Sequence, residues 1–238
     1  MATEAVRTIQ RALNDKGFDP GPVDGVWGRA TIAAVMRFQT ANALTPDGVV
    51  GPATRAALLA STNPAAPAAA AITATLLPWF EEAKHLVGTK EVLGPKSNLT
   101  ILDWAKSLEI PYPGDDIAWC GLFVSHCIGA TLPQEVLPGN PLGARQWERF
   151  GDSTTPRTGA IMVFWRDTPA SGKGHVGFYV GEDETAYQIL GGNQSDSVCL
   201  TWLDKKRLVA ARWPKSASAL VTSSVRKSRD QGLSSNEA

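Results

Sequence analysis

Apolar side chains recur at helical spacing within residues 1–60. Positions three and four residues apart lie on one face of a helix, so such a stripe predicts a helix with one buried face. Two stripes have this spacing: Val6, Ile9 and Leu13, and then Ile32, Val35, Met36 and Gln39.

A short segment occurs twice in the same region. Residues 24–31 read DGVWGRAT, and residues 47–54 read DGVVGPAT. Each copy is a glycine turn followed by residues that start a helix, and glycine suits the positive φ or close packing of such turns. Together with the apolar stripes, the repeat predicts a three-helix domain over residues 1–60.

From residue 78 the spacing of apolar residues changes from helical to alternating. Alternation with a period of two, bounded by turn residues, is typical of strands. The expected helices are 79–87, 99–108, 120–130 and 141–150, and the expected strands are 160–165, 175–180, 186–190, 198–202 and 208–213. Helices followed by antiparallel strands predict an α+β domain over residues 78–214.

Two segments of biased composition flank this second domain. Residues 61–77 are rich in alanine and proline, which predicts a semi-rigid linker. Residues 215–238 are rich in serine and contain few large apolar residues, which predicts a disordered tail. We therefore expect two folded units in one chain, and a monomer.

Composition and charge narrow the class of partner. The 238 residues are 43% hydrophobic and 19% charged, and the formal net charge is zero. Nucleic acid and anionic membranes call for a clustered basic surface, so neither is expected as the main partner. No apolar run approaches the roughly 18 residues that a membrane span needs.

The N-terminus and the cysteines indicate a compartment. Residues 1–5 lack a basic segment followed by an apolar one, so no Sec signal is expected. The three cysteines are scattered and odd in number, which leaves at least one free thiol. Both features suit synthesis in a reducing cytoplasm.

Cys120 is the first candidate for chemistry. It is expected in the first turn of the helix 120–130, where the positive end of the helix dipole stabilises a thiolate. A free thiol has a pKa of about 8.5, and a neighbouring imidazolium lowers this pKa further. The alternative is a buried structural cysteine, the common fate of a free thiol. Cys127 and Cys199 are expected mid-helix and mid-strand, and therefore to be structural.

His175 and Asn193 are the second and third candidates. His175 opens the strand 175–180 behind glycines, which gives it room to face a cleft; a surface or capping histidine is the alternative. Asn193 ends the next strand, where its side-chain carbonyl could accept the imidazole Nδ1–H and fix the tautomer. A turn asparagine fits the same position. Gln194 and Asp196 are neighbours that could take the orienting role.

Zinc chemistry is the first rival to a thiol. A zinc amidase needs three clustered ligands, often with a closely spaced histidine pair. The three histidines stand far apart, and His126 lies on a different helix face from Cys120. No metal and no cofactor are therefore expected. A glycosidase with paired carboxylates stays open, with Glu91, Asp103 and Asp116 as candidates that no spacing singles out.

Residues 5–58 carry a set of motif residues in a fixed order. Besides the two glycine turns, these are Gln10, Leu13, Gly17, Phe38, Gln39 and Leu44. With them, the segment resembles the three-helix peptidoglycan-binding domain of many cell-wall enzymes. The resemblance implies bacterial peptidoglycan as partner. Trp27 is the candidate contact residue, because an exposed aromatic could stack on sugar or peptide; the alternative is that it fills the small core.

Four motifs follow in order in the second domain. They are Trp119-Cys120 followed by Phe123-Val124, then Gly174-His175-Val176-Gly177, then Leu190-Gly191-Gly192-Asn193-Gln194, and finally Arg212-Trp213-Pro214. With them, residues 78–214 resemble the CHAP and NlpC-type cysteine peptidases, papain-like folds that cut peptidoglycan amides, and in particular those of phage and prophage origin. In many CHAP members a glutamate stands two positions before the third polar residue, and here that position is Gly191.

The two resemblances together imply an endolysin-like peptidoglycan hydrolase. In it, His175 activates Cys120, and Asn193 orients the imidazole. The bond would be a stem-peptide amide or the N-acetylmuramoyl-L-alanine amide. The protein would be made in the cytoplasm of the bacterial host and reach the wall by a holin-type route. The alternatives are a non-catalytic wall-binding or structural phage protein, and an acyltransferase or transglutaminase with the same nucleophile.

Overall fold

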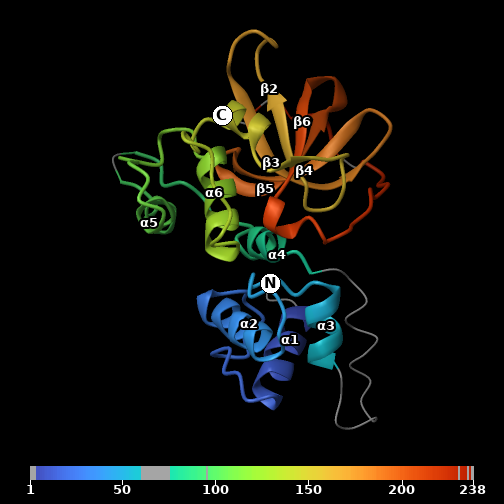
Figure 1. The fold of residues 1–238 in the computed structure, drawn as a ribbon. Coiled ribbons are helices and arrows are strands. Elements are labelled where there is room, and N and C mark those ends of the chain that lie inside the picture. The colour runs from blue at the N-terminus through green and yellow to red at the C-terminus, as the bar shows by residue number, and fades with distance from the viewer. Residues whose placement is uncertain (1–3, 60–75, 95, 230, 235, 237–238) are drawn as a thin grey trace.

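A computed structural model describes residues 4–59, 76–94, 96–229, 231–234 and 236. Three helices form the first body: α1 (Glu4–Asp15), α2 (Arg29–Ala41) and α3 (Pro52–Leu59). The other elements form a larger body of helices and one antiparallel sheet (Figure 1). The α+β class is confirmed. The linker expected at 61–77 lies outside the described residues except for Leu76 and Leu77, which are buried.

A buried glutamine closes the first copy of the sequence repeat. The Gln10 side chain is 1% exposed, and its Oε1 accepts the Gly25 N–H at 2.8 Å. Its Nε2 donates to Asp24 Oδ1 at 3.0 Å, to the Val26 carbonyl at 3.1 Å and to Thr31 Oγ1 at 3.2 Å. One amide thus fastens the turn to α1 and to the start of α2.

The second copy repeats the same network. The Oε1 of Gln39 accepts the Gly48 N–H at 2.9 Å. Its Nε2 donates to Asp47 Oδ1 at 2.7 Å, to the Val49 carbonyl at 2.9 Å and to Thr54 Oγ1 at 3.1 Å. Because Gln39 lies on α2 and the turn leads into α3, the two networks link all three helices.

Apolar packing completes the first body as the helical spacing predicts. Its buried residues include Val6, Ile9, Leu13, Ile32, Val35 and Phe38. Met36 is only partly buried. The Phe18 and Phe38 rings meet edge to face with centroids 5.4 Å apart.

Three α-helices precede the sheet in the second body: α4 (Pro78–His85), α5 (Leu99–Ser107) and α6 (Cys120–Thr131). Pro78 has the fixed φ that suits a first helical position. Asn98 caps α5 by accepting the Thr100 N–H at 2.8 Å. Among the residues that the structure describes, no helix combines the length and apolar character that a membrane crossing requires.

The prediction of an α-helix at 141–150 is wrong in both the type and the length of the helix. Only the 3₁₀ helix η2 (Ala144–Arg149) forms there. The preceding backbone lies directly against α6: a Cβ on Gly121 would fall 2.4 Å from the carbonyl oxygens of Pro141 and Leu142. This contact holds the segment in a non-helical path, which the apolar spacing did not reveal.

Within the described residues, six antiparallel strands form one sheet in the order β1-β6-β2-β3-β4-β5. They are β1 (Asp152–Ser153), β2 (Ile161–Trp165), β3 (Gly174–Glu182), β4 (Ala186–Gln194), β5 (Ser197–Asp204) and β6 (Leu208–Trp213). All five expected strands are present, and β3, β4 and β5 extend beyond their expected bounds. α6 packs on β3 and β4 and, on its other sides, on α4 and α5 (Figure 1).

The described residues after 215 differ from the disordered tail expected there. Leu220 is 1% exposed. The Val225 N–H donates to the Tyr179 hydroxyl at 3.1 Å, and the Glu182 N–H donates to the Val225 carbonyl at 2.8 Å. This segment is held by backbone hydrogen bonds to β3, and a serine-rich composition gives no sign of them.

Replacing Gln39 with alanine should destabilise the first body by about 2–4 kcal/mol, because the buried Gly48 N–H and the Thr54 hydroxyl lose their partner. Thermal unfolding of the full chain should show an earlier transition, which hydrogen exchange should map to α1–α3. Thr40→Ala, at an exposed position of the same helix, is the matched control and should change little. Equal stability of the two variants would contradict the role of the glutamine.

Candidate active site

Cys120 is the first residue of α6 and is 3% exposed. The residue before it, Trp119, is the N-cap of the helix and is held from two sides. Its backbone N–H donates to Asn193 Oδ1 at 3.0 Å, and its indole Nε1 donates to Glu91 Oε2 at 3.2 Å. The start of α6 is therefore tied to the end of β4.

Burial raises the pKa of the Cys120 thiol above its ordinary value. The backbone N–H groups of Val176 and Gly121 and the charge of Arg166 lower it. The helix start thus favours the thiolate as expected, but the loss of solvent outweighs it in the resting protein. The hydrogen bond with Val176 also places the sulfur beside the start of β3, one residue from His175.

His175 is fully buried on β3, and its Nε2 lies 3.0 Å from Gln194 Oε1. Gln194 is the last residue of β4, is 1% exposed, and donates from its Nε2 to the Cys199 carbonyl. Because the amide nitrogen is engaged with Cys199, the amide oxygen faces the imidazole and accepts its Nε2–H. Gln194 therefore favours the tautomer in which Nδ1 is the basic nitrogen.

Asn193 occupies a different place from the one expected. It is 3% exposed, its φ is +57°, and its side chain accepts the Trp119 N–H. Gln194, its neighbour, holds the imidazole, and it does so at Nε2 rather than at the expected Nδ1. The register of β4 against β5 shifts between Gly191 and Gln194. Such an irregularity re-aims the following side chains, and no sequence pattern discloses it.

Two glycines let α6 approach the sheet. A Cβ on Gly192 would lie 2.6 Å from Phe123 Cβ. A Cβ on Gly191 would lie 2.9 Å from His175 Nε2 and 2.8 Å from Gln194 Oε1. Any larger residue at 191 would displace the pair, so the amide of Gln194 fills the space where the resemblance suggests a glutamate.

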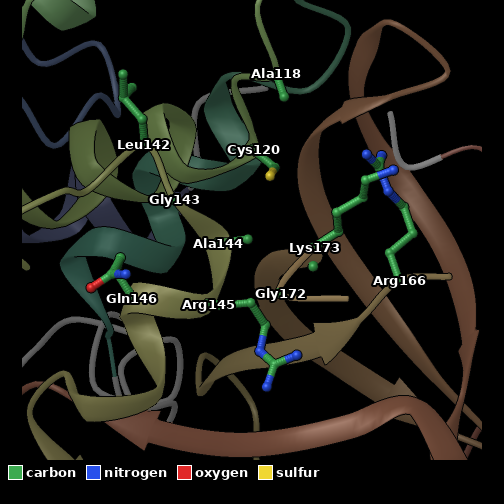
Figure 2. Close-up of a pocket in the computed structure, with 11 residues that line it drawn as sticks. Ala118, Cys120, Leu142, Gly143, Ala144, Arg145, Gln146, Arg166, Gly172 and Lys173 are labelled. Carbon is green, nitrogen blue, oxygen red and sulfur yellow. The ribbon is translucent and has the colours of Figure 1, made fainter. Parts of the chain in front are cut away.

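A cavity of about 240 Å³ opens beside Cys120 (Figure 2). The Cys120 sulfur points into it, and η2 and the loop before β3 form other parts of its wall. The lining residues are Ala118, Cys120, Leu142–Gln146, Arg166 and Gly172–Gly174. Arg145 and Arg166 were missed in the sequence, because no motif marks them. The buried thiol can thus be reached from this cavity.

Cys127, Cys199 and His126 lie in surroundings that are typical of structural residues. Cys127 is buried within α6, and burial raises the pKa of its thiol well above the ordinary value. Cys199 lies on β5 and is partly buried. The His126 ring stacks on Trp104, with centroids 5.1 Å apart, and its Nε2 lies 3.2 Å from Glu82 Oε1.

The carboxylates named for a glycosidase lie in separate places. Glu91 contacts the Trp119 indole, while Asp103 and Asp116 are exposed. Nothing pairs them across the cavity at Cys120, whose described lining contains no carboxylate. Within the described ranges, no three His, Cys, Asp or Glu side chains gather as a metal site would require.

Trp27 is 3% exposed and belongs to the apolar core of the first body. Its indole therefore offers no open face on which a sugar could stack. It also lines a cavity of about 430 Å³ that it shares with Trp104 and His126 of the second body. A wall contact at Trp27 stays a prediction, and this cavity is the place where Trp27 could make it.

Residues 2–58 match the family model described as "Putative peptidoglycan binding domain". A protein of Kitasatospora aureofaciens, named "Uncharacterized protein in bpoA1 3'region", is 48% identical over 56 residues. That match covers 23% of this chain and 48% of the relative, so it spans about half of the relative's length. No solved structure matches the chain significantly. The first body thus matches a peptidoglycan-binding domain, which suggests an association with the cell wall.

Arg166→Gln should raise the pKa of Cys120 further, because it removes a positive charge that favours the thiolate. The pH dependence of Cys120 alkylation by iodoacetamide, followed by mass spectrometry of its peptide, measures this pKa. We expect the midpoint of alkylation to move to higher pH. Lys106→Gln removes the same charge at an exposed site on α5 and should cause none. An unchanged titration in Arg166→Gln would remove Arg166 from the electrostatics of the thiol.

Proposed function

We propose that the protein is an endolysin-type peptidoglycan hydrolase in which Cys120 and His175 cleave an amide bond of the wall. The observation that carries the proposal is the hydrogen bond of the Cys120 sulfur with the Val176 N–H, the residue after a histidine whose ring is held by Gln194. A thiol at a helix start and an imidazole at a strand start are the parts that a papain-like mechanism would use. The peptidoglycan-binding domain supports the choice of substrate.

In the proposed reaction, Nδ1 of His175 takes the proton of the Cys120 thiol. Gln194 prepares this step, because it accepts the Nε2–H and leaves Nδ1 as the base. The same hydrogen bond stabilises the imidazolium that forms. Burial alone disfavours the thiolate, so the imidazolium and Arg166 supply the compensating charge.

The thiolate then attacks the carbonyl carbon of the scissile amide. Backbone N–H groups at the start of α6, that of Cys120 included, stabilise the oxyanion. The imidazolium protonates the leaving amine, and water hydrolyses the thioester to release the acid. Asn193 serves this step indirectly, because it holds the Trp119 N–H and with it the start of the helix.

The peptidoglycan-binding domain contributes by keeping the enzyme at its insoluble substrate. A tethered catalytic domain meets scissile bonds at a higher effective concentration than a free one. As part of the same proposal, the protein is made in the cytoplasm of the bacterial host and reaches the wall by a holin-type route.

Two other functions use parts of the same arrangement. A non-catalytic wall-binding protein would need no ordered base, whereas His175 is buried and held by Gln194. An acyltransferase would share the thioester but pass the acyl group to an amine. Mass spectrometry of digested wall separates transfer from hydrolysis, and the new termini identify the amide that is cut.

Cys120→Ala and His175→Ala should each lower kcat/KM on soluble muropeptides by about three orders of magnitude or more, because nucleophile and base are lost. Gln194→Ala should cost about 10–100-fold, or ~1.4–2.8 kcal/mol, because it orients the ring without taking part in bond breaking. Circular dichroism checks the fold of each variant.

Cys127→Ala is the matched control, because it removes a thiol from the same helix and should keep most activity. Full activity of Cys120→Ala would refute the thiol mechanism. If Gln194→Ala keeps the wild-type rate while Asn193→Ala does not, the orienting role returns to Asn193.

Full-length Cys120→Ala should sediment with purified insoluble peptidoglycan, since the domain that associates the protein with the wall stays intact. A chain that begins at residue 76 should remain in the supernatant. Quantified sedimentation over a range of wall concentrations measures the difference, which we expect to be about tenfold or more. Equal retention of both chains would place wall binding in the second body.

A further inference from the structure

A second cavity, of about 430 Å³, lies between the two bodies. The first body contributes residues 26–29 of its first glycine turn, and the larger body contributes residues of α4, α5 and α6. Figure 1 shows the first body against this helical side of the larger one. Ligand sites are commonly cavities of roughly 300–1,000 Å³ at domain interfaces. The cavity shares no lining residue with the one at Cys120 and is a separate candidate site.

Three aromatic rings line the cavity between the bodies. Trp104 on α5 and His126 on α6 stack with their centroids 5.1 Å apart and their planes 19° from parallel. Trp27 joins them from the first body. Aromatic side chains of this kind combine a large apolar surface with a polar ring nitrogen. The lining therefore suits a ligand that has both apolar and hydrogen-bonding parts.

Two ring nitrogens of this lining have no hydrogen-bond partner. Among the residues that the structure describes, Trp27 Nε1 and His126 Nδ1 are buried atoms without one. Trp27 as a whole is only 3% exposed. A buried polar atom without a partner costs free energy, and the large majority of such atoms in proteins have one. The two nitrogens therefore point to a ligand that hydrogen-bonds to both.

Glu82 determines the character of the His126 nitrogen. His126 Nε2 lies 3.2 Å from Glu82 Oε1, and an ionised carboxylate can only accept, so Nε2 carries the hydrogen. Nδ1 of the neutral imidazole is then an acceptor. The indole Nε1–H of Trp27 is a donor and nothing else. The cavity thus has one unused donor from the first body and one unused acceptor from the larger body.

A secondary amide offers the complementary pair. Its carbonyl oxygen accepts from Trp27 Nε1–H, and its N–H donates to His126 Nδ1. Peptidoglycan contains secondary amides both in the acetamido groups of its sugars and in the peptide bonds of its stems.

The charges of the lining favour the sugar over the peptide. Glu82 and Asp103 are carboxylates, and Arg29 is the cation that lines the cavity with them. Two carboxylates and one cation disfavour an anionic ligand, and a stem peptide carries free carboxylates. Thr100 and Ser107 add hydroxyl groups, which suit the hydroxyls of an uncharged sugar.

We propose that this cavity binds an uncharged N-acetylated sugar of the glycan strand, with its acetamido group between Trp27 Nε1 and His126 Nδ1. The inference rests on the proposed function only for the source of the sugar, which is the cell wall. Both nitrogens are covered in this structure, so the sugar reaches them as the two bodies move slightly apart. Contacts between domains of one chain yield more readily than domain cores. A glycan held here leaves the Cys120 cavity open to the stem peptide.

The test measures binding to the full-length Cys120→Ala protein, so that no peptide is cut during the measurement. Chitotriose, which is a trimer of N-acetylglucosamine, is compared with cellotriose, which has a hydroxyl in place of each acetamido group. Calorimetry should show about tenfold tighter binding of chitotriose, because cellotriose lacks the amide. In NMR spectra of the eight tryptophan indoles, the Trp27 Nε1–H signal should shift with chitotriose alone. The absence of this signal in Trp27→Phe assigns it.

Two variants each remove one nitrogen and keep an aromatic ring. Trp27→Phe and His126→Phe, made in the same full chain, should each weaken chitotriose binding about fivefold or more and leave cellotriose binding little changed. Trp165→Phe is the matched control, because its indole donates to the Lys206 carbonyl outside this cavity. Thermal unfolding checks each fold. His126 belongs to the larger body, so its variant tests the site even if Trp27→Phe loosens the first body.

Three results would overturn the site: equal affinity for the two sugars, a Trp27 signal that chitotriose does not shift, or unchanged chitotriose affinity in both variants. A synthetic stem tetrapeptide is the third ligand. If it binds with the same dependence on Trp27 and His126 and chitotriose does not, the amide belongs to the peptide and the sugar is refuted. Failure of the proposed function looks different, because the wild type would then leave muropeptides uncut while chitotriose still binds.

Discussion

The close approach of α6 to the sheet is the constraint on which the candidate site depends. Gly192 lets the helix lie on β4, and Gly121 lets the Pro141–Leu142 backbone close over the first turn. Asn193 fixes the helix start through the Trp119 N–H. Because these contacts leave no room for another Cβ, the Cys120 sulfur is confined to the start of β3. A site built on packed elements holds its geometry better than one on loops.

This same packing creates an electrostatic conflict at Cys120. The helix start and the neighbouring N–H groups favour a thiolate, while burial disfavours it more strongly. In the proposed mechanism, the thiol becomes a thiolate only when the His175 imidazolium forms. Gln194 affects the thiol through His175, because its hydrogen bond favours the tautomer with the proton on Nε2. Arg166, at the cavity, favours the Cys120 thiolate by its charge and does not bury the sulfur further.

The first body contains only about sixty residues, a size at which a stable fold needs more than a small apolar core. Gln10 and Gln39 each satisfy several backbone and side-chain groups of a glycine turn, so the turns act as part of the core. Val49, from the second turn, belongs to the apolar core of the larger body. Trp27 and Trp104 border one cavity between the two bodies. The two bodies are thus in direct contact.

The sequence by itself determined the two bodies, the five long strands, the position of Cys120 at a helix start and the family of the first domain. Those properties are local, because periodicity, turn glycines and motif order depend on neighbouring residues. Only the tertiary structure decided that Gln194 rather than Asn193 meets His175, that residues 141–143 stay non-helical, and that Val225 hydrogen-bonds to β3. It also brought Arg145, Arg166 and Lys173 to one cavity. Each of these features depends on contacts between distant segments, such as the packing of α6 on the sheet, or on a local irregularity such as the one in β4. The spacing of residues along the chain does not predict either kind of feature.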